Sequence, residues 1–320
     1  MGLAAADETP QFSALTGGVS SDIWKVDLAR GPVCIKRALA QLKVAATWRA
    51  PVERNASEVG WIEVARRIVP GCAPRILGHD PDAGLFAMEY FDSADYRLWK
   101  SELRDGLVDI SMAVAVGDTL GRIHAATAGD GGLARRFSND AIFYDIRLEP
   151  YLVAAGRAHP DRAGALKALA TVTAQTKQLL VHGDVSPKNI LLGPDGPVFI
   201  DAECAWYGDP AFDLGFCLNH LLLKCVWTPR AAAAYLDAFD ALSAAYLAHV
   251  DWETAAALEA RTAHLLPGLL VARIDGKSPV QYVSASADKD FVRRIARDLL
   301  ANPVERLGEV RATWRKGLPG

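Results

Sequence analysis

The most constraining feature of this sequence is a polar loop enclosed by two apolar runs. Leu179-Leu180-Val181 leads into His182-Gly183-Asp184-Val185-Ser186-Pro187-Lys188-Asn189, and Ile190-Leu191-Leu192 follows. The two apolar runs are typical of short buried strands, which would hold the loop rigid at both ends. Asp184 can accept a proton from a hydroxyl group, and Asn189 can offer an amide oxygen to a hard cation. We therefore predict that this loop carries catalytic chemistry.

A second acidic residue follows at a suitable distance. The apolar run from Pro197 to Ile200 delivers Asp201 twelve residues after Asn189, a length suited to a β-hairpin. Asn189 and Asp201 can then share one Mg²⁺ ion, which prefers oxygen ligands and keeps several waters. Metal binding is therefore assigned to these two residues.

Three further residues are predicted to support the loop. Asp213, shortly after Gly208-Asp209-Pro210, can accept hydrogen bonds from the loop amides and fix their positions. His182 is expected to pack and to bond the loop backbone rather than to transfer protons. His124 is expected to be a structural residue on a helix that packs against the loop.

Composition limits the class of protein. The chain has 320 residues, of which 51% are apolar, enough for one large domain or two lobes. Its formal net charge of −3 gives no general electrostatic reason to expect nucleic acid or an anionic membrane as a partner. The five scattered cysteines form no C-x-x-C pair, which favours free thiols. With no signal-like start and no long apolar run, we predict a cytoplasmic protein.

Secondary-structure signals change along the chain. Short strands are predicted over 12–15, 23–26, 33–36, 75–78 and 85–90, with one helix over about 55–68. After this point helical patterns dominate, as over 110–126 and 231–248. The sequence thus predicts a small β-rich part followed by a large helical part.

The ordered set His182-Gly183-Asp184, Asn189, Asp201 and Gly208-Asp209-Pro210 with Asp213 closely resembles the signature of the aminoglycoside phosphotransferase and choline kinase family. The resemblance implies an α+β, two-lobed protein-kinase-like fold. It would divide into an N-terminal lobe of residues 1–91, with a hinge at 88–91, and a C-terminal lobe of residues 92–320. It also implies ATP- and Mg²⁺-dependent phosphorylation of a hydroxyl on a small molecule.

The same resemblance assigns nucleotide-binding residues. Lys36 looks like the strand lysine that grips the phosphates, and Glu58 is its expected partner, chosen over Glu53 and Glu63 on the same helix. The segment Met88-Glu89-Tyr90-Phe91 looks like the hinge that pairs with adenine, through the Glu89 carbonyl and the Phe91 amide. The nucleotide-covering loop would contain Gly17, Gly18, Ser20 and Ser21.

Acceptor-binding residues are harder to assign. Glu203 is either a second metal ligand or a solvated neighbour of Asp201, and Trp206 and Tyr207 either line the acceptor pocket or belong to the core. Arg147 and Arg273 lie in segments that mix charged and apolar residues, for which surface salt bridges are the favoured interpretation. The chain gives no indication of its oligomeric state.

Rival functions remain open at this level. The stretch from Asp201 to Gly208 faintly resembles methylthioribose kinases, which favours a sugar-like or amino-alcohol acceptor over an antibiotic. A nucleotide-binding pseudokinase is the alternative, although Lys36, Asp184, Asn189 and Asp201 are all present. Gly183 and the Asp201-Ala202-Glu203 triplet depart from the protein-kinase pattern and disfavour a polypeptide substrate.

Overall fold

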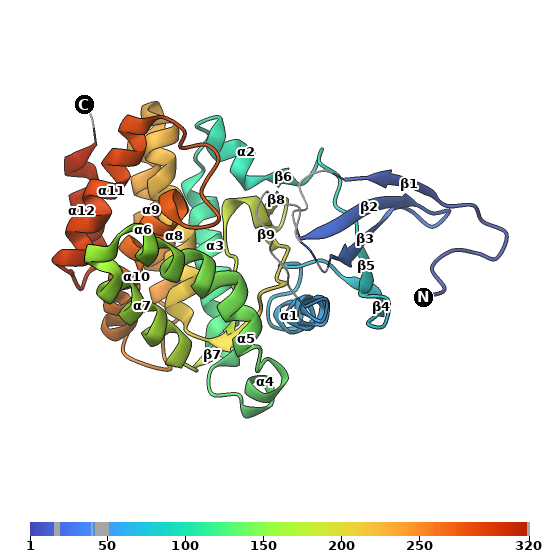
Figure 1. Ribbon diagram of the computed structural model, residues 1–320. Coiled ribbons are helices and arrows are strands. Elements are labelled where there is room, and N and C mark those ends of the chain that lie inside the picture. Colours follow the sequence, from blue (N-terminus) through green and yellow to red (C-terminus); the bar gives the residue numbers. More distant parts are fainter. Residues whose placement is uncertain (16–19, 40, 42–50, 319–320) are drawn as a thin grey trace.

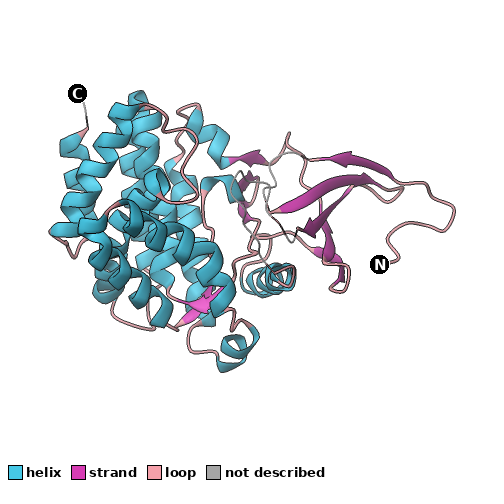
Figure 2. Cartoon of the chain, viewed as in Figure 1, coloured by secondary structure: helices cyan, strands magenta, loops and turns pink. Residues whose placement is uncertain are grey.

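The protein consists of a small sheet-containing lobe and a larger helical lobe, seen side by side in Figure 1. The computed structural model describes residues 1–15, 20–39, 41 and 51–318. The N-terminus lies at the far end of the small lobe and the C-terminus at the far end of the large one (Figure 1). Strands gather in the first lobe and helices in the second (Figure 2), as the sequence predicts.

The N-terminal lobe is built on one antiparallel sheet. Its strands are β1 (Gln11–Ala14), β2 (Ser21–Asp27), β3 (Val33–Ala38), β4 (Ile76–Asp80) and β5 (Leu85–Glu89), in the spatial order β1-β2-β3-β5-β4. In the register of β3 and β5, Lys36 lies opposite Phe86. The sheet places Lys36 on a central strand, where its ammonium is buried.

Helix α1 (Arg54–Ile68) is the one helix between β3 and β4 within the described residues. Trp61, Ile62 and Ala65 are fully buried, which fixes the orientation of the helix through burial of apolar surface. Figure 1 shows α1 between the sheet and the helical lobe. The helix ends before Pro70, where the ring cannot continue the hydrogen-bond ladder.

Two small sheets shape the face of the C-terminal lobe that meets the N-terminal lobe. β6 (Arg97–Leu98), β8 (Ile190–Gly193) and β9 (Gly196–Phe199) form one sheet, and β7 (Leu179–Val181) pairs with β10 (Trp206–Gly208) in the other. In the β8–β9 hairpin, Ile190 lies opposite Phe199. The predicted hairpin between Asn189 and Asp201 is confirmed.

Helices make up the rest of the C-terminal lobe. Their bounds are α2 (Trp99–Arg104), α3 (Ile110–Thr127), α4 (Gly131–Arg136), α5 (Asp140–Phe143), the π-helical segment η1 (Tyr144–Val153), α6 (Ala154–Ala158), α7 (Ala163–Gln175), α8 (Pro210–Trp227), α9 (Ala232–Leu247), α10 (Ala255–Asp275), α11 (Ser286–Ala301) and α12 (Leu307–Gly317). Helix α8 is buried along almost its whole length and packs against both α9 and α10. It forms the centre of the lobe.

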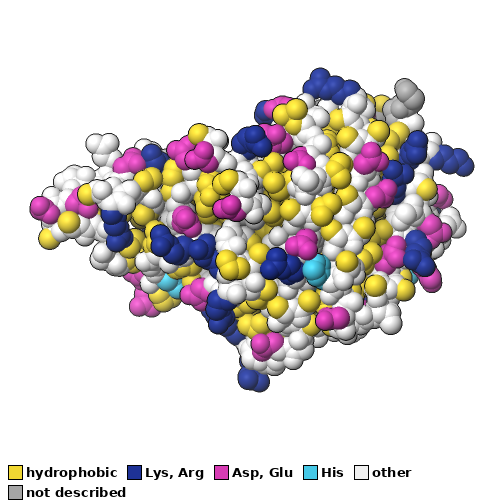
Figure 3. All heavy atoms as spheres, turned by 180° about the vertical axis from the view of Figure 1, so that it is seen from behind, with side chains coloured by type: hydrophobic (Ala, Val, Ile, Leu, Met, Phe, Trp, Pro, Cys, Tyr) yellow, Lys and Arg dark blue, Asp and Glu magenta, His cyan; other side chains and the backbone are white. Residues whose placement is uncertain are grey.

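On the face shown in Figure 3, positive and negative side chains are interspersed over both lobes. None of the described helices is both long and apolar enough to cross a lipid bilayer. All five cysteines are buried and unpaired, which confirms the expectation of free thiols.

Candidate active site

The loop 182–189 is held in shape by Asp213. This residue lies in the first turn of α8, and its two carboxylate oxygens accept hydrogen bonds from the amides of His182 (2.6 Å) and Gly183 (2.8 Å). His124 also lies against Asp213, at 3.3 Å, and hydrogen-bonds Tyr246. Asp213 thus makes the predicted contacts with the loop amides, and His124 packs against Asp213; their supporting roles stay predictions.

His182 is a packed residue of the loop. Its Nδ1 accepts a hydrogen bond from the Asp184 amide, so Nε2 donates to the carbonyl of Ile200 at 3.1 Å. The ring meets Trp61 edge-on, with centroids 4.7 Å apart. Burial is the largest influence on the imidazole and lowers its pKa despite the nearby carboxylates. Both ring nitrogens are therefore engaged in hydrogen bonds, and the lack of a proton-transfer role stays a prediction.

Gly183 is required by the local backbone. Its φ is +78°, a region that residues with a side chain rarely adopt. A Cβ atom here would lie 2.5 Å from the carbonyl oxygen of Cys204, which is backbone and cannot move aside cheaply. The departure from the protein-kinase pattern at this position therefore has a steric cause.

Asp184 is buried between two cations. One of its oxygens lies 2.9 Å from Arg147 Nη2 and 2.9 Å from Lys188 Nζ. Burial alone would raise the pKa of the Asp184 carboxyl, but the charges of Arg147 and Lys188 outweigh it and hold that pKa below its ordinary value. Asp184 is thus an ionised carboxylate, suited to orienting a hydroxyl group and accepting its proton.

Arg147 comes from an unusual helix. It lies within η1, a π-helical segment, and its Nε donates to the carbonyl of Gly183. π-Helical turns are rare and often occur at functional sites. The surface salt bridges expected for this segment do form, between Glu149 and both Arg157 and Lys277. Arg147 itself is directed inward to the loop 182–189.

Asp201 and Asn189 lie at the two ends of the β8–β9 hairpin. The amide of Ile200, next to Asp201, donates to the carbonyl of Asn189 at 3.0 Å. Asn189 Nδ2 donates to the carbonyl of Asp184, which leaves Oδ1 as the atom that can ligate a cation. Asp201 has φ +67°, a left-handed value found at no other non-glycine residue in the described part of the chain. Such strained backbone is typical of functional positions.

This donor set fits Mg²⁺. Lys36 donates to one oxygen of Asp201, and Lys188 Nζ lies 3.8 Å from the other. Burial would raise the pKa of Asp201, but these lysines outweigh it and keep the carboxyl ionised. One carboxylate, one amide oxygen and the phosphate oxygens of a nucleotide would suffice for an ion that retains several waters.

Lys36 pairs with the expected partner. Its Nζ lies 2.7 Å and 2.9 Å from the two oxygens of Glu58, deep in the lobe. Burial disfavours the ammonium, yet Asp201 and Glu58 outweigh it and raise the pKa of Lys36 well above its ordinary value. The two other candidate partners of Lys36 lie elsewhere. Glu63 pairs with Arg136 on the surface, and Glu53 precedes α1.

The proposed nucleotide-covering loop is only partly described. Gly17 and Gly18 lie outside the described residues. Ser20 and Ser21 are buried at the start of β2, and the carbonyl of Ser20 accepts hydrogen bonds from Leu39 and Arg54. These contacts anchor one end of the loop.

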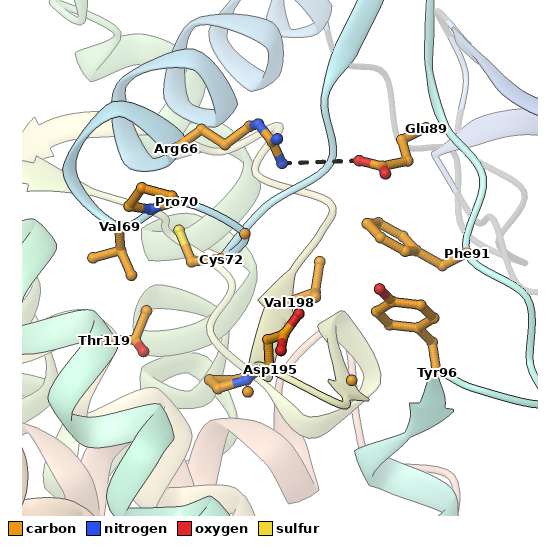
Figure 4. A pocket seen from close by; sticks show the side chains of 14 residues that line it. Arg66, Val69, Pro70, Cys72, Glu89, Phe91, Tyr96, Thr119, Asp195 and Val198 are labelled. Carbon is orange, nitrogen blue, oxygen red and sulfur yellow. Dashed lines mark ion pairs between the residues drawn. The ribbon is translucent and has the colours of Figure 1, made fainter.

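The segment 88–91 connects the lobes and borders a pocket of about 220 Å³, shown in Figure 4. Arg66 and Glu89, both in its lining, form an ion pair of 3.8 Å, and the ring centroids of Phe91 and Tyr96 lie 4.5 Å apart. Met88 is buried within β5, and the amide of Glu89 donates to the carbonyl of Arg75. The lining contains none of Lys36, Asp184 and Asp201, so the pocket is separate from the cluster of charges that these residues form.

The remaining acceptor candidates divide into two groups. Trp206 and Tyr207 are buried; the first stacks on Phe143 and hydrogen-bonds Asp140, and the second bonds the carbonyl of Gln178. Their contacts correspond to the core interpretation. Glu203 is buried beside Arg54 Nε at 3.0 Å, so it is not a solvated neighbour of Asp201.

Arg273 lies on α10 and has neutral partners. It contacts the carbonyl and hydroxyl of Ser278 and the hydroxyl of Tyr151, while its Nε has no hydrogen-bond partner among the described residues. In the segment 273–277 the expected surface salt bridge is formed by Lys277, with Glu149, and not by Arg273.

Two site residues escaped the sequence analysis. Lys188 lies inside the loop 182–189, four residues after Asp184, and this nearness in sequence could have indicated the ion pair that forms. Arg54 opens α1 with no local signal of its role; it is fully buried and joins Glu203 to the carbonyls of Ser20 and Leu39.

Comparisons with known proteins agree with this geometry. Residues 11–258 match the model of the phosphotransferase enzyme family. Methylthioribose kinase of Pectobacterium carotovorum subsp. carotovorum is 28% identical over 233 residues, covering 63% of this chain and 58% of that protein. Methylthioribose kinase of Bacillus cereus is 26% identical over 234 residues, covering 64% and 58%. The chain thus spans somewhat under two thirds of the length of these relatives.

Solved structures resemble the whole chain. An ethanolamine kinase of Plasmodium vivax has a TM-score of 0.58 at 13% identity, covering 99% of this chain and 86% of that one. A choline kinase of Cryptosporidium parvum has a TM-score of 0.57 at 12% identity, covering 95% and 93%. An amicoumacin kinase in complex with AMP-PNP and Ca²⁺ has a TM-score of 0.56 at 13% identity, covering 93% and 90%. These likenesses establish the kinase-like fold, and the family match shows that the chain belongs to the phosphotransferase enzyme family.

Proposed function

We propose that this protein is an ATP- and Mg²⁺-dependent kinase that phosphorylates a hydroxyl group of a small metabolite. The observation that carries the proposal is the convergence of Lys36, Asp184, Asn189 and Asp201 from separate strands and loops around one charged cluster. The curated relatives are methylthioribose kinases, which supports the same reaction class.

Each residue has a role that follows from its contacts. Lys36, fixed by Glu58, would hold the nucleotide phosphates, and Asn189 and Asp201 would bind Mg²⁺. The metal supplies charge neutralisation for the transferred phosphoryl group. Asp184 would orient the acceptor hydroxyl and accept its proton, while Arg147 positions Asp184 through their ion pair. Positioning and electrostatics account for most of the rate enhancement in such reactions.

We also propose that the lobes divide at residue 91 and that segment 88–91 binds adenine. A cytoplasmic location is part of the same proposal. β5 ends at Glu89, and the next strand, β6, already pairs with β8 in the helical lobe. Segment 88–91 therefore connects two separately built sheets, which is the position a hinge would take.

A small-molecule acceptor is favoured over a polypeptide. Only seven residues separate Asp201 from Asp209, which caps α8, and most of them are buried. This segment leaves no extended platform on which a peptide could lie.

The experiment is a nucleotide-consumption assay with Mg²⁺ across sugars, amino alcohols, aminoglycosides and peptides. Acceptor-free and Mg²⁺-free reactions serve as blanks. Turnover that depends on one small hydroxylated compound would support the proposal. Stimulation by peptides alone, or tight ATP binding with no turnover on any compound, would favour a protein kinase or a pseudokinase instead.

A further inference from the structure

A second pocket, the α2 pocket, lies on the helical lobe between α2, the end of α8 and the loop that follows α10. It has a volume of about 540 Å³, and its walls include Lys100 and Arg104 from α2 together with Trp227 and Tyr282. Figure 1 shows the loop after α10 running close to α2. The lining within the described residues contains two cations and no carboxylate.

Lys224 does not itself line this pocket but lies directly against Trp227 and Tyr282, two rings of its wall. Its side chain is fully buried, and in the described part of the chain its Nζ has no hydrogen-bond partner. The Nζ atom is 3.9 Å from the ring centroid of Trp227 and 4.0 Å from that of Tyr282, the two stacked rings that line the pocket. Burial, together with the positive charges of Lys100 and Arg104, lowers the pKa of Lys224 to about 6; Arg104 itself pairs with Asp105 at 2.7 Å.

Other polar atoms beside Lys224 also lack partners. His220, one turn earlier on α8, uses Nδ1 to contact the hydroxyl of Tyr282, but its buried Nε2 is unbonded among the described residues. The charges nearest to His220 are Arg273, Lys224, Lys188 and Lys100. The Nε atom of Arg273 is likewise unbonded. Positive charge and unused donors therefore concentrate in one region.

This arrangement differs from the other buried cations of the protein. Lys36 pairs with Glu58, and Arg147 pairs with Asp184. A buried cation without a partner is costly, and buried donors in folded proteins are nearly always bonded. Among the described residues no carboxylate pairs with Lys224, whose Nζ faces the rings of Trp227 and Tyr282. An anionic group in the α2 pocket would supply the counter-charge that this region lacks.

We propose that the α2 pocket binds an anionic oxygen group of the phosphate acceptor, so that the acceptor is a hydroxylated carboxylate or phosphate ester rather than a cationic amine or aminoglycoside. This inference rests on the proposed kinase function. Lys100 and Arg104 line the pocket, Arg273 adds a positive charge nearby, and Lys224 and His220 offer buried nitrogen atoms that have no hydrogen-bond partner among the described residues.

The position of the pocket favours the acceptor over an unrelated ligand. Helix α2 packs against the turn 187–189 of the catalytic loop. Burial lowers the pKa of Lys100 most, and the charge of Lys188, which contacts Asp184, lowers it further. An anionic group held beside Lys100 therefore places the rest of the molecule toward Asp184. A cationic acceptor would meet like charges in the same place.

The direct test is sulfate binding to the full chain, measured by titration calorimetry against chloride at equal ionic strength. The unmutated protein should bind sulfate saturably. Lys100→Met and Lys224→Met should each weaken binding at least about tenfold, as expected for loss of a charge-assisted contact. Lys167→Met, on an exposed face of α7, should leave it unchanged. Using two variants keeps the test valid if one of them fails to fold.

Absence of sulfate binding by the parent protein, or binding by both pocket variants as tight as that of the parent, would overturn the inference. A second arm compares gluconate and ribose 5-phosphate with their neutral parents glucose and ribose in the turnover assay. Preference for either anionic member supports the inference and separates carboxylate from phosphate; preference for the neutral parents overturns it. Because sulfate binding needs no turnover, failure of the kinase proposal and failure of the anion site are distinguishable.

Discussion

Arg147 Nη2 and Asp184 Oδ2 lie 2.9 Å apart, and both side chains are almost completely buried. The pair links the π-helical segment η1 to the catalytic loop, two regions far apart in sequence. It keeps Asp184 ionised and fixes the direction of its carboxylate, because Arg147 also binds the carbonyl of Gly183.

Replacing Arg147 by Met should affect both stability and the pH profile. Breaking a buried ion pair on one side destabilises a protein by roughly 3–5 kcal/mol. Without Arg147 the pKa of Asp184 should rise, so the acidic limb of the kcat profile should move to higher pH. Arg147→Lys should restore part of this shift. An unmoved acidic limb in Arg147→Met would show that the pair does not set the ionisation of Asp184.

Gly183→Ala should reduce both stability and turnover. The new Cβ would lie 2.5 Å from the Cys204 carbonyl at a positive φ, so the catalytic loop must shift. Gly164→Ala is the matched control: it lies in α7 with open space around it, and alanine there should stabilise the helix by about 0.5–1 kcal/mol. Thermal melts and turnover rates measure both effects. Equal, mild outcomes for the two variants would contradict the steric argument.

Asp201→Asn should raise the Mg²⁺ concentration needed for half-maximal turnover by at least about tenfold, because one anionic ligand is lost. Asp195→Asn, on the exposed turn of the same hairpin, provides the control. Activity is titrated with Mg²⁺ for all three proteins. An unchanged Mg²⁺ requirement in Asp201→Asn would remove Asp201 from the metal site.

Lys224 should make stability depend on pH. In the folded protein, burial and the charges of Lys100 and Arg104 lower the pKa of Lys224 from its ordinary value of 10.5 to about 6. Between these values the unfolded chain binds more protons, so the free energy of unfolding rises with pH across this window and falls as pH approaches 6.

Lys224→Met removes this contribution. The variant should be more stable than the parent at pH 7, and the difference between them should shrink as the pH is raised toward 9. Denaturant unfolding at several pH values measures it. Parallel stability curves would mean that the lysine remains charged in the fold. Sulfate binding at pH 7 should in turn be accompanied by proton uptake, because an anion restores the charge of Lys224.

The sequence was sufficient for the elements with strong local signals. The strands of the first lobe, helix α1, helix α3 and the β8–β9 hairpin all form within a few residues of their predicted bounds. The amides of His182 and Gly183 donate to Asp213 as expected. This contact could be predicted because the order and spacing of these residues in the sequence already indicated it.

What the sequence did not reveal depends on tertiary packing. Arg147 lies in a segment of mixed charge that resembles a solvated helix, and only the π-helical turn directs it inward to Asp184. Lys224 lies on α8, a strongly apolar helix. The residues around the nearby pocket come from α2 and from the loop after α10, which are far away in sequence. Contacts between residues so far apart in the chain leave no local pattern in the sequence.

The central claim is phosphoryl transfer that depends on Asp184. The direct measurement is transfer of the labelled γ-phosphoryl group from ATP to the preferred acceptor by the parent protein and by Asp184→Asn, with ATP binding measured in both. The account predicts that ATP binding is retained and that transfer falls by at least about 10²-fold, the scale of a lost general base. Equal transfer rates in the two proteins would contradict it.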